Sequence, residues 1–263
     1  MSGLGDPWLA SLRERTDCSP LAPREPLWWG HHRIGSVEHH VAAALHLPQL
    51  KHERDGWRIH GDMTPSLEQI AEALRDAGTV RAWRNEQLAV IDDEGHLLGT
   101  CERGVARLLG IATRAVHLIG LTPEGHHWVQ QRALDKASDP GMWDTLVGGM
   151  VAAKDTRESA LERETWEEAG LRMAELQEVA YGGHLFTRRP SGEQPCGYVV
   201  ERIDWYRAVV PRGVVPTNQD GEVAQFASVA PAQLCTRLQH DEFTLDAGLI
   251  FVAAGVGRER ANG

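Results

Sequence analysis

The chain has 263 residues and a formal net charge of −10 at pH 7. This length accommodates one large domain or two modest ones. The acidic balance argues against a nucleic-acid scaffold, which would present a basic surface. It allows a small anionic substrate, because a bound metal ion can reverse the local field.

Cysteine usage and the first residues indicate the compartment. The four cysteines are far apart and form no Cys-x-x-Cys pair: Cys18, Cys101, Cys196 and Cys235. We therefore expect neither a disulfide framework nor a structural zinc site, as suits a reducing cytoplasm. The N-terminal residues contain charges and no apolar core of a secretion signal, and no stretch has the length needed to cross a bilayer. The sequence predicts a cytoplasmic protein with neither membrane nor nucleic acid as a partner.

The first half of the chain divides into two parts. Residues 1–25 are polar and rich in Pro and charge, so we expect a loosely ordered lead-in. Residues 26–112 are expected to form a small α+β domain. Its predicted elements are a helical segment at 37–47, an amphipathic helix opened by Pro65 and running through Ala77, and a hairpin of 83–90 and 96–101.

Residues 113–263 make a second predicted domain. Predicted strands cover 116–121, 128–132, 178–187, 197–210 and 222–229. The apolar run 145–147 is expected to be a strand that stops in a tight loop at Gly148 and Gly149, and residues 145–151 lead into the next helix. Predicted helices follow Asp155, start at Pro231 and cover 247–254. The alternation of strands and helices indicates an α/β fold.

Histidine pairs occur at 31–32, 39–40 and 126–127. Adjacent side chains point apart on a strand or a helix, and none of the pairs fits the HExxH spacing of a zinc protease. We therefore do not expect a histidine metal site.

The most informative segment is a carboxylate-rich predicted helix. Glu164, Glu167 and Glu168 stand at i, i+3 and i+4, so they share an arc roughly 100° wide. Ala160 and Leu161 fall within or beside that arc, which indicates that it faces the protein. Carboxylates gathered on an inward face repel one another unless a cation compensates, and an all-oxygen cluster suits Mg²⁺ or Mn²⁺. From the charges alone, a solvated acidic helix is an equally open interpretation.

The ends of this helix have their own signals. Asp155 followed by Glu158 resembles a capping box, so removing Asp155 is expected to lower stability more than turnover. Gly170 suits a left-handed C-terminal cap. Arg163 lies beside Glu167 on the helix surface and is expected to pair with carboxylates and hold them in position.

The spacing of these residues resembles a known signature. Residues 149–171 spell Gly-x5-Asp-x7-Arg-Glu-Thr-x-Glu-Glu-x-Gly-Leu, which is similar to the Nudix hydrolase pattern Gly-x5-Glu-x7-Arg-Glu-U-x-Glu-Glu-x-Gly-U, with U aliphatic. Asp155 and Thr165 depart from it. The resemblance implies a Nudix α/β/α sandwich with a mixed sheet, preceded here by the small α+β domain. It also implies metal binding by Glu164, Glu167, Glu168 and the backbone of Gly149.

A narrower resemblance extends beyond this segment. The run 135–149, with Lys136, Pro140-Gly141 and Trp143-Asp144, looks like the corresponding stretch of thiamin pyrophosphokinase-related Nudix proteins. Residues 220–226 and 241–247 are also similar to that subgroup, and residues 78–83 and 109–121 resemble its N-terminal domain. The resemblance implies a Mg²⁺-dependent diphosphatase that converts oxidised thiamin diphosphates to monophosphates.

The reaction needs a base and groups that hold phosphate. Glu167 or Glu168 is the first candidate base, and Glu222 is the second, although it could equally be a surface turn acid. Arg132 and Lys136 could clamp phosphate oxygens. A further residue, Trp143, could stack on the substrate ring or simply pack.

Other functions stay open. In Nudix enzymes for ADP-ribose a proline commonly follows the signature where this chain has Phe186, and in those for diadenosine polyphosphates a tyrosine stands where it has Arg188 and Arg189. These differences make ADP-ribose, a nucleotide sugar or a diadenosine polyphosphate a weaker candidate substrate without excluding any of them. A non-catalytic Nudix-fold binding module is a third reading, which the intact carboxylates disfavour. The role of the N-terminal domain and a homodimer are also open.

Overall fold

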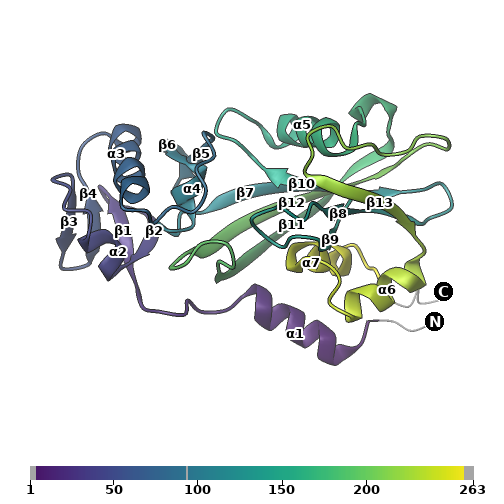
Figure 1. Cartoon of the computed structure of the whole chain (residues 1–263), viewed down its shortest axis with the longest axis horizontal. Helices are drawn as coiled ribbons and strands as arrows, with labels where there is room; N and C mark the ends of the chain where they lie inside the picture. Colours follow the sequence, from purple (N-terminus) through teal and green to yellow (C-terminus); the bar gives the residue numbers. More distant parts are fainter. Residues whose placement is uncertain (1–3, 93, 258–263) are drawn as a thin grey trace.

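The computed structural model describes residues 4–92 and 94–257. It places a small N-terminal α+β region beside a larger sandwich of helices and sheet (Figure 1). Within these described ranges, no helix is both long and apolar enough to cross a membrane.

The N-terminal region is built on its own sheet of four strands in the order β2-β1-β4-β3. Its elements are β1 (Arg24–Trp29), β2 (His32–Glu38), α2 (His39–Ala43), β3 (Leu50–Glu53), β4 (Gly56–Ile59), α3 (Met63–Asp76), the hairpin β5 (Gln87–Ile91) and β6 (Leu97–Glu102), and α4 (Arg103–Ala106). Leu67, Ile70 and Leu74 form one apolar stripe of α3 and are fully buried in the core of this region. The predicted helix and hairpin are thus confirmed.

One predicted element is wrong in part. Residues 37–47 were expected to be helical, but β2 continues through Glu38 and α2 is short. The reason lies in strand pairing, because Val37 lies opposite Glu25 of β1 in the ladder and is fully buried.

The larger sheet has seven strands. They are β7 (Thr113–Leu121), β8 (His127–Arg132), β9 (Trp143–Asp144), β10 (Val147–Met150), β11 (Gln177–Pro190), β12 (Tyr198–Val209) and β13 (Val223–Val229). The main order is β11-β12-β7-β8-β13, with β10 paired to β7 and β9 to β8. The sheet is mixed, since β12 runs parallel to β7 whereas β10 and β8 pair with β7 in antiparallel fashion.

Helices cover both faces of this sheet (Figure 1). On one face α5 (Arg157–Ala169), followed by the short η1 (Met173–Glu175), packs over Val116 and Leu118 of β7. On the other face α6 (Pro231–Gln239) and α7 (Leu245–Ala253) pack over Ala115 and Ile119 of the same strand. The alternation of β7 between the two cores follows from the two-residue period of a strand. The predicted α/β/α sandwich is confirmed.

The lead-in contains a helix that the sequence interpretation missed. α1 (Asp6–Thr16) opens with Pro7 in its first turn, and Leu12, 3% exposed, packs against α7. The hydroxyl of Thr187 on β11 donates to the carbonyl of Thr16 at 2.9 Å, and the backbone N–H of Cys18 donates to Arg188 O at 2.8 Å. Residues 6–18 therefore lie against the larger sheet, and the expectation of a loosely ordered segment is corrected for them.

Candidate functional site

The ends of α5 show how the carboxylate helix is held. The hydroxyl of Thr156 accepts from Ser159 N at 3.1 Å, and Ser159 Oγ accepts from Thr156 N at 2.9 Å. The capping box therefore consists of Thr156 and Ser159, and the assignment of Asp155 and Glu158 to it is corrected. Gly170 takes the left-handed conformation, with φ of 64°, as predicted for the C-terminal cap.

Arg163 connects the start of the segment to its carboxylates. Its Nε and Nη2 donate to Asp155 Oδ2 at 3.1 and 3.0 Å. Its Nη1 donates to Glu164 Oε1 at 2.8 Å and to Glu167 Oε2 at 3.0 Å, and Nη2 also donates to Met150 O at 3.2 Å. The carboxylate of Asp155 thus holds the guanidinium of Arg163 in position. It does not cap the helix, and the neighbouring Thr156 does. Arg163 in turn orients two of the predicted metal ligands.

Glu168 is buried, and Glu164 is largely buried, with a side chain that is 13% exposed. Glu168 is 2% exposed, and its Oε2 accepts from Gly148 N and from Gln130 Nε2, both at 2.9 Å. Burial and the nearby Glu164 raise the pKa of Glu168 to about 8, although these two hydrogen bonds act in the opposite direction. Burial also raises the pKa of Glu164 to about 7 despite the adjacent Arg163. Glu168 is therefore held without a contact to a positively charged group among the described residues, whereas Glu164 pairs with Arg163.

The two glycines of β10 allow neighbouring side chains to approach the backbone, the Glu164 carboxylate at Gly149 and the His117 imidazole at Gly148. A Cβ on Gly149 would lie 2.0 Å from Glu164 Cδ, and a Cβ on Gly148 would lie 2.4 Å from His117 Cε1. Both glycines stand inside β10, paired with β7, rather than in the tight loop expected after the strand. Only glycine at 149 lets the backbone and the Glu164 carboxylate approach this closely.

The chemistry of this donor set fits a hard divalent cation. Glu164, Glu167 and Glu168 offer carboxylate oxygens only, which is the ligand type that Mg²⁺ and Mn²⁺ prefer. Burial raises the pKa values of Glu164 and Glu168 by disfavouring their charged forms, and a bound cation would favour those charged forms. Glu167 has a side chain that is 42% exposed, compared with 13% for Glu164, so the cluster opens toward solvent on the side of Glu167.

A cavity of about 760 Å³ adjoins Gly149 and Glu164. Its cationic lining residues come from several parts of the chain: Arg15, Arg103, Arg107, Arg132, Lys136 and Arg189. Arg103 and Arg107 belong to the N-terminal region, where the carboxylate of Glu102 caps α4 by accepting from Gly104 N at 3.2 Å. The sequence interpretation missed these two arginines, because nothing in their spacing connects them with residues 149–171.

The predicted phosphate-binding residues lie on this cavity. Lys136 Nζ forms an ion pair with Glu222 Oε2, so these two predicted residues meet. Partial burial alone would raise the pKa of Glu222, but the hydrogen bond and the charge of Lys136 lower it. Arg132 donates from Nε and Nη2 to Ser138 O at 3.1 and 3.0 Å, and its Nη1 lies 3.7 Å from Asp144 Oδ2. Arg132 is thus anchored within the cavity wall.

Trp143 has a different environment from the other predicted substrate-binding residues. The guanidinium of Arg237 lies 4.2 Å from the centroid of its ring, and the indole packs against the core that contains Phe243. Trp143 is not among the described residues that line the cavity. The ring thus packs against this core, which is one of the two roles that the sequence left open, and stacking on substrate stays a prediction.

A NUDIX domain model matches residues 112–248, which is more than half of the chain. The chain therefore belongs to the Nudix family, and these residues form a Nudix hydrolase domain. The match begins where the larger sheet begins, at β7.

Individual relatives have more specific names. Nudix hydrolase 20, chloroplastic, of Arabidopsis thaliana is 28% identical over 187 residues, which are 69% of this chain and 49% of that protein. The chain thus spans about half the length of that relative. An isopentenyl-diphosphate Delta-isomerase of Streptomyces coelicolor is 29% identical over 160 residues, 60% of this chain and 77% of the isomerase. The crystal structure of DR0079 from Deinococcus radiodurans superposes with a TM-score of 0.51 and 20% identity, covering 66% of this chain and 100% of that one, and so supports the fold.

Proposed function

We propose that this protein is a Mg²⁺- or Mn²⁺-dependent diphosphatase that cleaves the phosphoanhydride bond of a small organic diphosphate. The observation that carries the proposal is the buried carboxylate of Glu168 and the largely buried carboxylate of Glu164, beside a cavity whose wall is rich in arginine and lysine. In the reaction, water adds to phosphorus and the phosphoanhydride bond breaks, so an organic diphosphate yields a monophosphate and inorganic phosphate.

The metal site consists of carboxylates that other residues hold in place. Glu164, Glu167 and Glu168 would bind the ion, which when bound would neutralise charge on the diphosphate and polarise its phosphorus–oxygen bonds. Arg163 fixes the first two carboxylates, while Gly148 N–H and the side chain of Gln130 fix the third. These contacts orient the carboxylates before substrate arrives, which reduces the reorganisation that the reaction requires.

The candidate bases differ in what surrounds them. Glu222 is paired with the ammonium of Lys136, which lowers its affinity for a proton. Glu168 accepts two hydrogen bonds from neutral groups on one oxygen, and no ammonium or guanidinium contacts that oxygen among the described residues. We therefore favour Glu168 over Glu222 as the group that accepts the proton from water. Glu167 remains the alternative, because it is the most exposed carboxylate of the cluster.

The cationic lining explains how a diphosphate would be held. Arg103, Arg107, Arg132 and Lys136 line the cavity together with Glu164. Guanidinium groups bind phosphate oxygens through paired hydrogen bonds, and an ammonium adds a compact positive charge. Because two of these residues come from the N-terminal region, that region forms part of the proposed substrate site.

We further propose oxidised thiamin diphosphates as the substrate class, on the resemblance of residues 135–149 to the thiamin pyrophosphokinase-related subgroup. One structural observation is compatible with it. Asp246 lines the cavity, its Oδ2 accepts from Arg189 at 3.0 Å, and its buried Oδ1 has no hydrogen-bond partner among the described residues. Because solvent does not reach this oxygen, the amino group of an aminopyrimidine ring would donate to it only after the Asp246 side chain rotated toward the cavity. Adenine carries an amino group too, so ADP-ribose remains the alternative.

The test is a comparison of kcat/KM in saturating Mg²⁺ at low substrate concentration. The panel contains oxothiamin and thiamin diphosphates, ADP-ribose, nucleotide sugars and isopentenyl diphosphate. A hundredfold preference for the thiamin series, about 2.7 kcal/mol in the transition state, would support both parts of the proposal. A preference for ADP-ribose would keep the metal site and replace the substrate. Isomerisation of isopentenyl diphosphate without phosphate release would replace the reaction itself, and failure to act on any of them would favour a binding module.

A further inference from the structure

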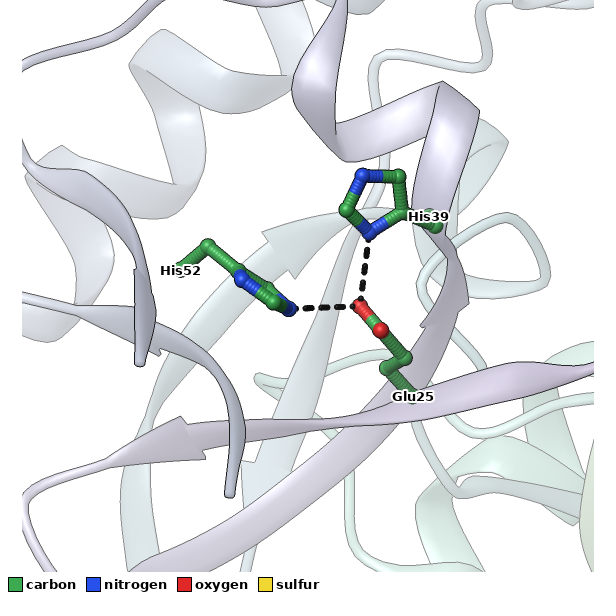
Figure 2. Close-up of side chains that lie close together, drawn as sticks. All are labelled: Glu25, His39 and His52. Atoms are coloured by element: carbon green, nitrogen blue, oxygen red, sulfur yellow. Dashed lines mark hydrogen bonds and ion pairs between the residues drawn. The ribbon is translucent and has the colours of Figure 1, made fainter. Parts of the chain in front are cut away.

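A second group of candidate metal ligands lies in the N-terminal region, outside the Nudix domain. Figure 2 shows its three side chains, Glu25 from β1, His39 from the start of α2 and His52 from β3. Glu25 Oε2 lies 3.1 Å from His39 Nδ1 and 3.1 Å from His52 Nε2. Two imidazoles therefore converge on one carboxylate oxygen.

The strand register explains why these residues meet. Trp57 of β4 pairs with His52 of β3 on one side and with Leu27 of β1 on the other. Glu25 stands two residues before Leu27, so Glu25, Trp57 and His52 share one face of the sheet. The ring of Trp57 lies 5.6 Å from that of His39 and 4.9 Å from that of His52, and Trp57 is 6% exposed. The cluster is thus supported from below by a buried aromatic ring on regular secondary structure.

We propose that Glu25, His39 and His52 form a binding site for a divalent transition-metal ion of the zinc type. Two imidazole nitrogens and one carboxylate oxygen are a ligand set that zinc accepts, and the three donor atoms lie within 4.8 Å of one another. In a tetrahedral zinc site with bonds near 2.0–2.1 Å, ligand atoms lie about 3.3 Å apart. The two observed separations of 3.1 Å are close to that value, so the ion can replace both hydrogen bonds with little movement.

The surroundings leave room for a fourth ligand. The side chains of Glu25, His39 and His52 are 34%, 59% and 44% exposed, so water can complete the coordination. An ion here would join β1, α2 and β3, and would stabilise the N-terminal region.

The neighbouring histidine provides a contrast. His40 Nδ1 lies 3.5 Å from Glu38 Oε2, whereas its opposite nitrogen, Nε2, lies 3.8 Å from Cys196 Sγ. The two nitrogens of His40 thus face different partners, whereas in the first cluster both imidazoles contact one carboxylate oxygen. One donor atom each from Glu38, His40 and Cys196 also lies within 4.8 Å of the others, so this second cluster is the competing site that the experiment must separate. His39 and His40 do point apart, as predicted for adjacent residues. The proposal departs from the expectation that no histidine metal site forms, because that expectation considered adjacent residues and His39 meets possible ligands from two other elements.

The experiment uses the full chain at neutral pH with saturating Mg²⁺, so that Zn²⁺ or Co²⁺ does not report on the Nudix carboxylates. We expect one equivalent of Co²⁺ to give a tetrahedral d–d spectrum without a thiolate charge-transfer band. We expect Zn²⁺, measured by competition with a chromophoric chelator, to raise the thermal midpoint. Both E25Q and H52Q should weaken Zn²⁺ binding at least about tenfold and remove this shift.

Two matched variants, H40Q and C196S, should bind as the wild type does. Thermal midpoints of E25Q and H52Q in EDTA that match the wild type would show that the loss is one of metal binding and not of folding. The proposal is overturned if wild-type protein fails to bind Zn²⁺, if H52Q binds as tightly as wild type, or if C196S abolishes a thiolate band, which would place the ion at Cys196.

Discussion

The Nudix domain and the N-terminal region each bring candidate metal ligands together. In the Nudix domain these ligands are close in the sequence, and in the N-terminal region they are far apart. Glu164, Glu167 and Glu168 stand within five consecutive residues of α5, and helical periodicity alone predicts that they share a face. Glu25 and His52 are 27 residues apart and meet because β4 lies between β1 and β3. Ligands on one helix can be read from spacing, whereas ligands on several strands depend on sheet order and register, which spacing does not encode.

The same difference applies to the proposed substrate cavity. Its metal side is supplied by β10 and α5, which lie together in the sequence, and part of its cationic wall comes from Arg103 and Arg107 of the other region. The N-terminal region is therefore joined to the Nudix domain through a shared cavity. Substitutions of residues on each side of that cavity measure how much each region contributes to substrate binding and turnover.

The largest expected effect comes from Glu168→Gln, which breaks the locally encoded site. The substitution preserves shape but removes the charge, so we expect kcat to fall about 10²–10⁴-fold with the fold intact. Steady-state assays on the best substrate of the panel, with circular dichroism as the control for folding, provide the measurement. Full turnover in this variant would contradict the assignment of Glu168 as ligand and base.

Glu168→Gln should also change how the stability of the metal-free protein depends on pH. Because burial raises the pKa of Glu168 to about 8 from 4.5, the protonated form is favoured in the folded state. The stability that the protonated Glu168 side chain gives the folded state is therefore fully present below about pH 4.5. It is lost as the pH rises through about 8, because the buried side chain then becomes charged. In EDTA, the melting temperature of the wild type should fall more steeply between pH 5.5 and 8.5 than that of Glu168→Gln, and Mg²⁺ should reduce this difference. Equal slopes in EDTA would show that the carboxylate is already compensated.

These results bear on what a sequence can predict. Helix α5 and its Gly170 cap follow from local sequence patterns and were predicted correctly. The helical layers on both faces of β7 agree with the sandwich that the resemblance implied. The capping box was misassigned because Asp155 satisfies the local rule, while its carboxylate is engaged by Arg163. The environment of Trp143, beneath Arg237, depends on how α6 packs against the sheet, and no local pattern reports that contact.

A smaller effect is expected from Arg103→Gln, which tests the contribution of the N-terminal region to the substrate site. Losing a charged contact to phosphate should raise KM roughly 10–100-fold, with a smaller change in kcat. The matched control is Glu86→Gln, which breaks the 2.6 Å ion pair between Glu86 and Arg103 but leaves the guanidinium at the cavity. If both variants raise KM equally, the arginine acts through local structure and the cavity belongs to the Nudix domain alone.

The smallest expected effects separate the two neighbours at the start of α5. Thr156→Ala removes the helix cap and should destabilise the protein by about 1 kcal/mol, with turnover per folded molecule unchanged. Asp155→Asn weakens the contact that holds Arg163, and through it Glu164 and Glu167, so it should lower kcat about tenfold with little loss of stability. This reverses the expectation drawn from the sequence, in which Asp155 was the cap. Denaturation midpoints and kcat of both variants decide the matter, since a cap contributes to the free energy of unfolding and a positioning residue to the rate. If Asp155→Asn lost stability but kept turnover, the carboxylates of α5 would not depend on Arg163 for their orientation, and helical spacing alone would suffice to build the site.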